Sequence, residues 1–290
     1  MSPAVRRAPS ARSPWGRTSW GNATPDSGAI VASGSIGPVK IGRDLKAVTV
    51  GGSGAGRIES GGAIASINVG RDLKGGAEAN TGVIRAQQNI GAIFGLDLGG
   101  TFINSGAIRA AHQLKSLTVG GDIVGNPSHF VAISGRGQLT PSATTDVAIG
   151  SAKVTGNVSF ANILAGYDQL GVALNPDAQI GTVKVGGNWT SGNVVAGVAS
   201  GGDTFFGNAG DLSIVSTNDT AIISKIASIT IGGTVNGTAV GGDFFGFVAE
   251  HVVAVKINGA AIVLTSGPGN NLVPVSTGSA TGDFFILEVV

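Results

Sequence analysis

Short apolar–polar–apolar segments that end in glycine recur along the chain. Residues 38–46 (PVKIGRDLK) return 28 residues later (66 − 38) as residues 66–74 (SINVGRDLK). Looser copies occupy residues 117–122, 183–188, 229–234 and 255–259. Since side chains alternate between the two faces of a strand, each copy predicts a short strand with one buried and one solvent-facing side.

The residues that close each copy indicate a turn. Glycine follows the second apolar residue in every copy but the last, and a small polar residue often follows soon after. Glycine adopts positive φ without steric cost, so we expect these glycines to form sharp corners with positive φ. The Asp, Asn or Thr side chains beside them can hydrogen-bond to the turn backbone.

One such unit is too short to bury its own apolar face, whereas stacked units bury the faces of one another. No segment has a sustained helical period. Residues 27–290 therefore predict an all-β domain, a single-stranded right-handed parallel β-helix (solenoid) of about ten irregular coils. Residues 1–26 are rich in Arg, Ser and Pro and are expected to be a disordered basic tail.

Composition narrows the alternatives. The 290 residues include 50 glycines and are 42% hydrophobic, 12% charged and of net charge +1. The hydrophobic content excludes a disordered chain, and the small net charge argues against nucleic acid as a partner. Glycine or a polar residue interrupts every apolar run, which argues against a membrane span. Cysteine is absent, and no motif predicts a cofactor or a metal ion.

A second periodicity in the C-terminal part brings together the candidate ligand contacts. A Gly-Asp-(Thr)-Phe-Phe segment recurs at intervals of 40 residues (243 − 203 and 283 − 243). Asp203, Asp243 and Asp283 could align as oxygen ligands for calcium, but capping of turns is the favoured interpretation.

The phenylalanines of these segments are the other candidates. Phe206, Phe245 and Phe285 are weak candidates for a platform on which a sugar ring stacks. Adjacent side chains of a strand face opposite ways, so one Phe of each pair is expected to pack inside the core. The outward member of each pair is the one that could contact a ligand.

Two blocks of sequence resemble a known family. They are the repeated Ile/Val-x-Ile/Val-Gly-Gly-Asp/Asn unit and the C-terminal segments 243–251, 255–259 and 282–289. In these the chain resembles the glycine-rich β-solenoid repeat proteins of the surfaces of Planctomycetes and related bacteria. The resemblance implies a secreted or cell-surface protein, although no signal peptide is visible in this chain. It implies no catalytic residues.

These observations predict a non-catalytic structural or adhesion protein of the cell surface, a fragment of a larger solenoid. The alternatives are a carbohydrate-binding β-helix module and a β-helical polysaccharide lyase or hydrolase. The carboxylates such an enzyme would draw on are scattered: Asp122, Asp146, Asp168, Asp177, Glu250 and Glu288. Expected partners are a polysaccharide or another cell-surface molecule, and further copies of the chain, because solenoid ends expose unpaired strand edges. Residues 284–290 are expected to form such an end strand.

Overall fold

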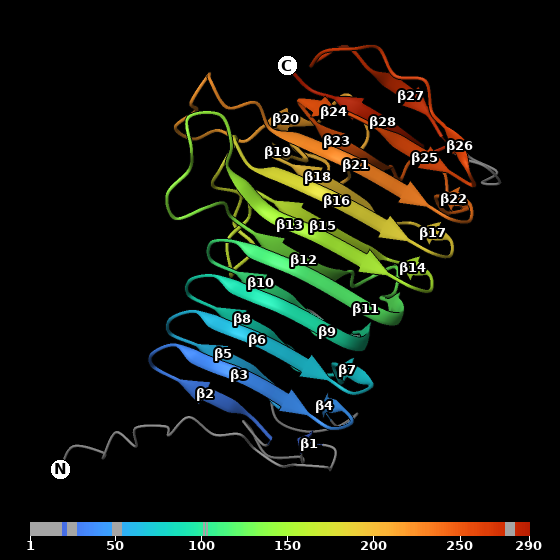
Figure 1. Cartoon of the computed structure of the whole chain (residues 1–290). Helices are drawn as coiled ribbons and strands as arrows, with labels where there is room; N and C mark the ends of the chain where they lie inside the picture. Colours follow the sequence, from blue (N-terminus) through green and yellow to red (C-terminus); the bar gives the residue numbers. More distant parts are fainter. Residues whose placement is uncertain (1–18, 22–27, 48–53, 101, 103, 276–281) are drawn as a thin grey trace.

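The protein is built from strands. The computed structural model describes residues 19–21, 28–47, 54–100, 102, 104–275 and 282–290, which contain no helix. Among them there is accordingly none long and apolar enough to cross a membrane. The strands form a 16-stranded sheet, a 10-stranded sheet and a two-stranded sheet. Figure 1 shows them stacked one above another from β2 and β3 to β27 and β28.

The larger sheet holds the long strands that carry the sequence repeat. Along its main path its strands are β1 (Ser19–Gly21), β4 (Leu45–Ala47), β7 (Asp72–Lys74), β9 (Ile90–Gly99), β11 (Leu114–Val124), β13 (Val147–Val154), β16 (Gln179–Val185), β21 (Lys225–Ile231), β25 (Val255–Ile257) and β26 (Ala260–Ala261). Beside this path are β3 (Ile36–Ile41), β6 (Ile64–Val69), β14 (Val158–Ser159), β17 (Trp189–Thr190), β22 (Val235–Asn236) and β24 (His251–Val252).

The smaller sheet consists of shorter strands. In order across the sheet they are β2 (Ile30–Ala32), β5 (Ile58–Ser60), β8 (Ile84–Ala86), β10 (Ile108–Ala110), β12 (Val131–Gly135), β15 (Ala161–Ala165), β18 (Asn193–Ala196), β23 (Phe245–Ala249), β28 (Phe284–Glu288) and β27 (Leu272–Pro274). β19 (Val198–Ala199) and β20 (Leu212–Ser213) form the two-stranded sheet. The chain alternates between the two large sheets, so each passage adds one layer to both.

The 28-residue repeat of the sequence is also the register between two of the first layers. Strand β3 pairs in parallel with β6, and Lys40 lies opposite Asn68, a shift of 28 residues (68 − 40). Between later layers the sequence separation of register partners varies. It is 24 residues between β9 and β11 (117 − 93) and 46 residues between β16 and β21 (229 − 183). Every strand pair is parallel except β19–β20, β25–β26 and β27–β28, within the part of the chain that the structure describes.

One apolar core runs the length of the stack between the two sheets. In the larger sheet Ile67, Ile93 and Leu117 lie in register on successive strands and are fully buried. In the smaller sheet a matching column consists of Ile58, Ile84, Ile108, Ile133 and Ile163. Each layer thus covers the apolar side chains of its neighbours, as expected of short repeats that cannot fold alone.

The prediction of positive φ was wrong for the glycines of every copy but the last, in which Gly259 has φ of 78°. Several of them, although not Gly120, are required for another reason, which is the close approach of the neighbouring layer. A Cβ atom on Gly186 would lie 2.2 Å from the carbonyl oxygen of Thr155, and one on Gly232 would lie 2.2 Å from that of Gly186. Positive φ occurs instead at glycines before strands of the smaller sheet, such as Gly82 (60°) and Gly106 (66°).

The polar residues after these glycines tie one layer to the next. Asp122 Oδ1 accepts a hydrogen bond from Asn157 N (2.6 Å), and Asn157 Oδ1 accepts one from Asn188 N (2.9 Å). Asn188 Oδ1 in turn accepts one from Thr234 N (2.9 Å). Bonding of these side chains to turn backbone was predicted, and the backbone they bond is that of the following layer.

The C-terminal end of the chain differs from the expectation of an unpaired end strand. Strand β28 is not an edge strand, because β27 pairs with it antiparallel. Pro274 in β27 lacks an N–H group, which makes this outer strand a poor template for further pairing. Of the predicted tail 1–26, only Ser19–Gly21 lie among the described residues, where they form β1 and pair with β4.

Close packing between layers predicts unequal effects of the same substitution at two glycines that occupy the same place in the repeat. Gly186→Ala should destabilise the protein by about 1–3 kcal/mol, since its Cβ meets backbone. Gly120→Ala is the control, because the nearest atom to its Cβ would be 3.9 Å away. Urea denaturation midpoints measure both. Equal midpoints for the two variants would contradict the packing argument.

Candidate functional site

The three repeated Gly-Asp-Phe segments converge on one surface hollow of about 390 Å³. Asp203 comes from the first segment, Phe244 from the second and Phe285 from the third. The glycine-containing loop 207–210 and Leu272 complete the wall. The hollow is shallow and open, and most of its wall is apolar.

One Phe of each pair is buried, as predicted. Phe206, Phe245 and Phe284 pack in the apolar clusters, whereas Phe244 and Phe285 are partly exposed. Of the three phenylalanines considered as ligand contacts, Phe285 therefore lines the hollow and the other two lie in the core. The strand register explains the difference, because Phe245 pairs with Phe284 and not with Phe285. A shift of one residue exchanges the two faces of a strand.

The outward phenylalanines form the apolar wall of the hollow. The ring centroids of Phe244 and Phe285 are 6.4 Å apart, and the ring planes are inclined by 38°. Leu272 of the neighbouring strand β27 is 63% exposed beside them. Such a surface can contact the apolar face of a ring-shaped ligand.

Asp203 caps its own turn, the role that the sequence favoured for all three aspartates. Asp203 Oδ1 accepts a hydrogen bond from Phe205 N (3.0 Å), and its Oδ2 accepts one from Asn208 Nδ2 (2.8 Å). Asp243 and Asp283 both accept hydrogen bonds from Thr238. The hydroxyl of Thr238 donates to Asp243 Oδ2 (2.5 Å), and its backbone N donates to Asp283 Oδ2 (3.1 Å). No cluster of three or more potential metal ligands occurs among the described residues.

A buried carboxylate holds the loop that forms one side of the hollow. Asp211 Oδ2 accepts hydrogen bonds from Gly207 N (2.6 Å) and Asn208 N (3.3 Å). Burial raises the pKa of Asp211 to about 6, and the charge of Asp203 adds to the rise. Gly207 has φ of 95°, and a Cβ there would lie 2.2 Å from the carbonyl oxygen of Phe245. The loop is therefore fixed against strand β23.

The scattered carboxylates considered for catalysis all have structural hydrogen bonds. Each accepts at least one from a backbone N–H group: Asp122, Asp146, Asp168, Asp177, Glu250 and Glu288. Glu288, for example, bonds Val252 N (2.8 Å) and Asn271 Nδ2 (2.8 Å). Their positions follow from the turns and layers that they join.

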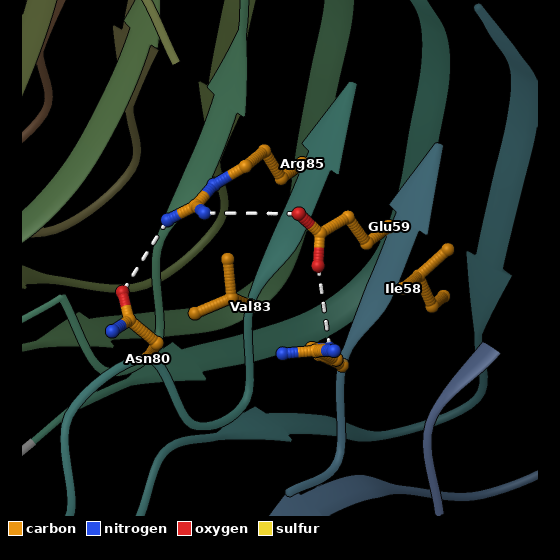
Figure 2. A pocket seen from close by; sticks show the side chains of 6 residues that line it. Ile58, Glu59, Asn80, Val83 and Arg85 are labelled. Atoms are coloured by element: carbon orange, nitrogen blue, oxygen red, sulfur yellow. Dashed lines mark hydrogen bonds and ion pairs between the residues drawn. The ribbon is translucent and has the colours of Figure 1, made fainter. Parts of the chain in front are cut away.

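A second, smaller hollow lies on the outer face of the smaller sheet (Figure 2). Glu59 lies between two arginines there, with its Oε1 3.8 Å from Arg85 Nη1 and its Oε2 3.3 Å from Arg57 Nε. Asn80 accepts a hydrogen bond from Arg85 (3.3 Å). The hollow has a volume of about 10 Å³, room for about one water molecule, so the arrangement is an ion-pair cluster of the sheet surface.

A short repeat that the sequence analysis missed places Arg85 of this ion-pair cluster beside a second arginine. Residues 80–85 (NTGVIR) and 104–109 (NSGAIR) are equivalent, and Arg85 and Arg109 lie side by side on β8 and β10. Arg109 is 7% exposed and bonds Asn104 (3.0 Å). Burial, together with the charge of Arg85, lowers the pKa of Arg109 to about 10. The 24-residue spacing (104 − 80) was the signal that could have revealed it.

Comparisons with known proteins find no match: no family model, no curated protein and no solved structure matches the chain.

The split of each Phe pair predicts unequal effects on stability. Phe284→Ala should lower the free energy of unfolding by about 3–5 kcal/mol because Phe284 is fully buried. Phe285→Ala, at the hollow, should lower it by about 1 kcal/mol. Denaturant titration compares them. A larger loss of stability for Phe285→Ala than for Phe284→Ala would contradict the assignment of Phe284 to the core.

The raised pKa of Asp211 predicts a pH dependence of stability. The folded state holds this proton up to about pH 6, whereas the unfolded state releases it near its ordinary pKa of 3.8. The folded state thus binds more protons between these values, and its stability falls as pH rises from about 4 to 6. Asp211→Asn should remove this part of the decline. Unfolding midpoints at pH 4, 5, 6 and 7 measure it, and parallel curves for both proteins would contradict the assignment.

Proposed function

We propose that the two large sheets are faces of one right-handed parallel β-helix, in which each passage of the chain is one coil. The alternation of the chain between the sheets supports this, as do the parallel register and the single core. A solenoid of this kind agrees with the resemblance to the β-solenoid surface proteins of Planctomycetes and related bacteria.

On this basis the protein is a non-catalytic structural or adhesion element of a cell surface, part of a larger solenoid. The observation that carries the proposal is a continuous column of outward side chains along the larger sheet. Its members follow one another in strand register: Lys40, Asn68, Phe94, Thr118, Lys153, Lys184, Thr230 and Lys256. A regular face of this kind suits contact with a long partner that has its own repeat.

A second column beside the first extends this polar face. It contains Ser116, Ser151, Thr182 and Ser228, two residues before the first column in each strand. Ser228 Oγ lies 3.4 Å from Thr182 Oγ1 across adjacent strands. Short hydroxyl side chains keep the face flat between the longer lysines, and flatness lets an extended polymer contact several coils at once.

Incubation with a panel of bacterial and algal polysaccharides tests the proposal. We expect at least one polysaccharide to retain the protein with no release of new chain ends, because an adhesion element binds without cleaving. Retention is measured by pull-down and cleavage by a reducing-end assay on the same samples. Sustained release of new chain ends would show an enzyme and contradict the proposal.

A second candidate function is carbohydrate binding at the hollow of Asp203, Phe244 and Phe285. The observation that favours it is the pair of outward aromatic rings beside an exposed carboxylate and the asparagine Asn208. Stacking on aromatic rings with a few polar groups at the rim is suited to a sugar ring.

Matched phenylalanine variants test this second candidate. The double variant F244A/F285A should lose glycan retention by at least about tenfold in Kd, since each ring supplies stacking area. F94A is the comparison variant, because Phe94 is 41% exposed and belongs to the outward column of the larger sheet, the binding surface of the first candidate function. Equal loss in both would place the binding on the polar face and remove the support for the hollow.

A further inference from the structure

We propose that the hollow selects an amino sugar in its protonated form, with the ammonium group against Asp203 and the sugar ring on Phe244 and Phe285. This inference rests on the second candidate function above and adds the chemical class of the ligand. It follows from the charge of the surrounding chain, the composition of the hollow and the hydrogen bonds of Asp203.

Charge is distributed unevenly along the chain. Residues 186–290 contain two lysines and seven carboxylates, a net charge of −5 (2 − 7). Residues 1–185 contain 16 basic and 10 acidic residues, a net charge of +6 (16 − 10). All residues that line the hollow belong to the acidic part. The summed field there attracts cations and repels anions.

The charge of the residues that line the hollow is also negative. Among the described lining residues Asp203 is the one with a charged side chain, and the buried Asp211 lies beneath the same loop. A uronic acid or a sulfated sugar would bring a second negative charge next to Asp203. An ammonium group would instead form a charge-assisted hydrogen bond with that carboxylate.

Asp203 retains the capacity for such a bond. Its side chain is exposed, and each carboxylate oxygen accepts one hydrogen bond from the protein, from Phe205 N and from Asn208 Nδ2. A carboxylate has about four acceptor positions, so both oxygens can accept a further donor. The two existing bonds hold the group in place, which lowers the entropy lost when a ligand binds.

The aromatic rings favour a sugar carrier for the ammonium group. Phe244 and Phe285 offer two ring faces at a centroid distance of 6.4 Å, broader than one ammonium group requires. The apolar face of a sugar ring can cover them, and a cation near a ring face gains further attraction. The hollow is open to solvent, so a sugar ring can enter it from outside.

Calorimetric titration of the full chain with three oligosaccharides of equal length tests the inference. The probes are a glucosamine oligosaccharide at a pH where its amine is protonated, its N-acetylated counterpart, and an oligogalacturonate. We expect the glucosamine probe to bind at least about tenfold more tightly than the N-acetylated one. We expect its advantage to shrink as salt is raised, and the galacturonate to bind weakest.

Two variants that each remove one negative charge test whether the preference for the amine depends on Asp203. Asp203→Asn keeps a side-chain oxygen for the N–H of Phe205 and should abolish the preference for the amine. Asp219→Asn is the control, since Asp219 is exposed, lies in the acidic part and does not line the hollow. Unchanged unfolding midpoints confirm that both variants fold. Loss of preference in both variants, or in neither, would overturn the inference.

The outcomes also separate this inference from the function on which it rests. Equal binding of the amine and its N-acetylated counterpart, both lost in F244A/F285A, would overturn the amino-sugar assignment and leave a neutral-sugar site. Failure of all three glycans to bind would overturn both. Binding of a lysine-containing peptide as tightly as the glucosamine probe would overturn the assignment to a glycan.

Discussion

The contact between one layer and the next determines most of this structure. Parallel strands stack at about 4.8 Å, so any atom that projects toward the neighbouring layer must be small or hydrogen-bonded. Gly186 meets this requirement against the carbonyl oxygen of Thr155, and Asn157 meets it by accepting the N–H of Asn188. The isoleucine column inside the smaller sheet meets it by stacking identical side chains. Regular inner positions leave the loops free to vary.

That freedom explains where the candidate site lies. The spacing between layers reaches 46 residues between β16 and β21 (229 − 183), and the additional chain includes loop 207–210. This loop meets the ring of Phe244, just before β23, the ring of Phe285 on β28 and Leu272 of β27. Function on a rigid repeat scaffold commonly resides in such insertions. The polar face of the larger sheet, by contrast, is a direct product of the repeat.

The repeats in the sequence predicted the strand type, because inward Ile and Val recur in every copy, but they did not predict the register between layers. They did not reveal β9 or β13, since Gly95 interrupts the first with a register shift and Thr155 replaces the usual glycine after the second. The positive φ predicted for the repeat glycines was wrong in every copy but the last, because local turn rules ignore the neighbouring layer. The hollow could not be predicted either. The lining residues Asp203, Phe244 and Phe285 are 41 residues apart (244 − 203 and 285 − 244), whereas the repeat is 40 residues long. The pairing of Phe245 with Phe284 shifts the third copy by one residue.

Disulfide cross-linking tests the stacked register most directly, because the chain has no cysteine of its own. Lys153 and Lys184 are exposed register partners on β13 and β16. The variant K153C/K184C should therefore form an intramolecular disulfide under mild oxidation, within the Cα separation of about 4.4–6.8 Å that the bond tolerates. K153C/K256C, with its cysteines about 14 Å apart, should remain reduced. Cross-linking of the second pair but not the first would contradict the layered arrangement.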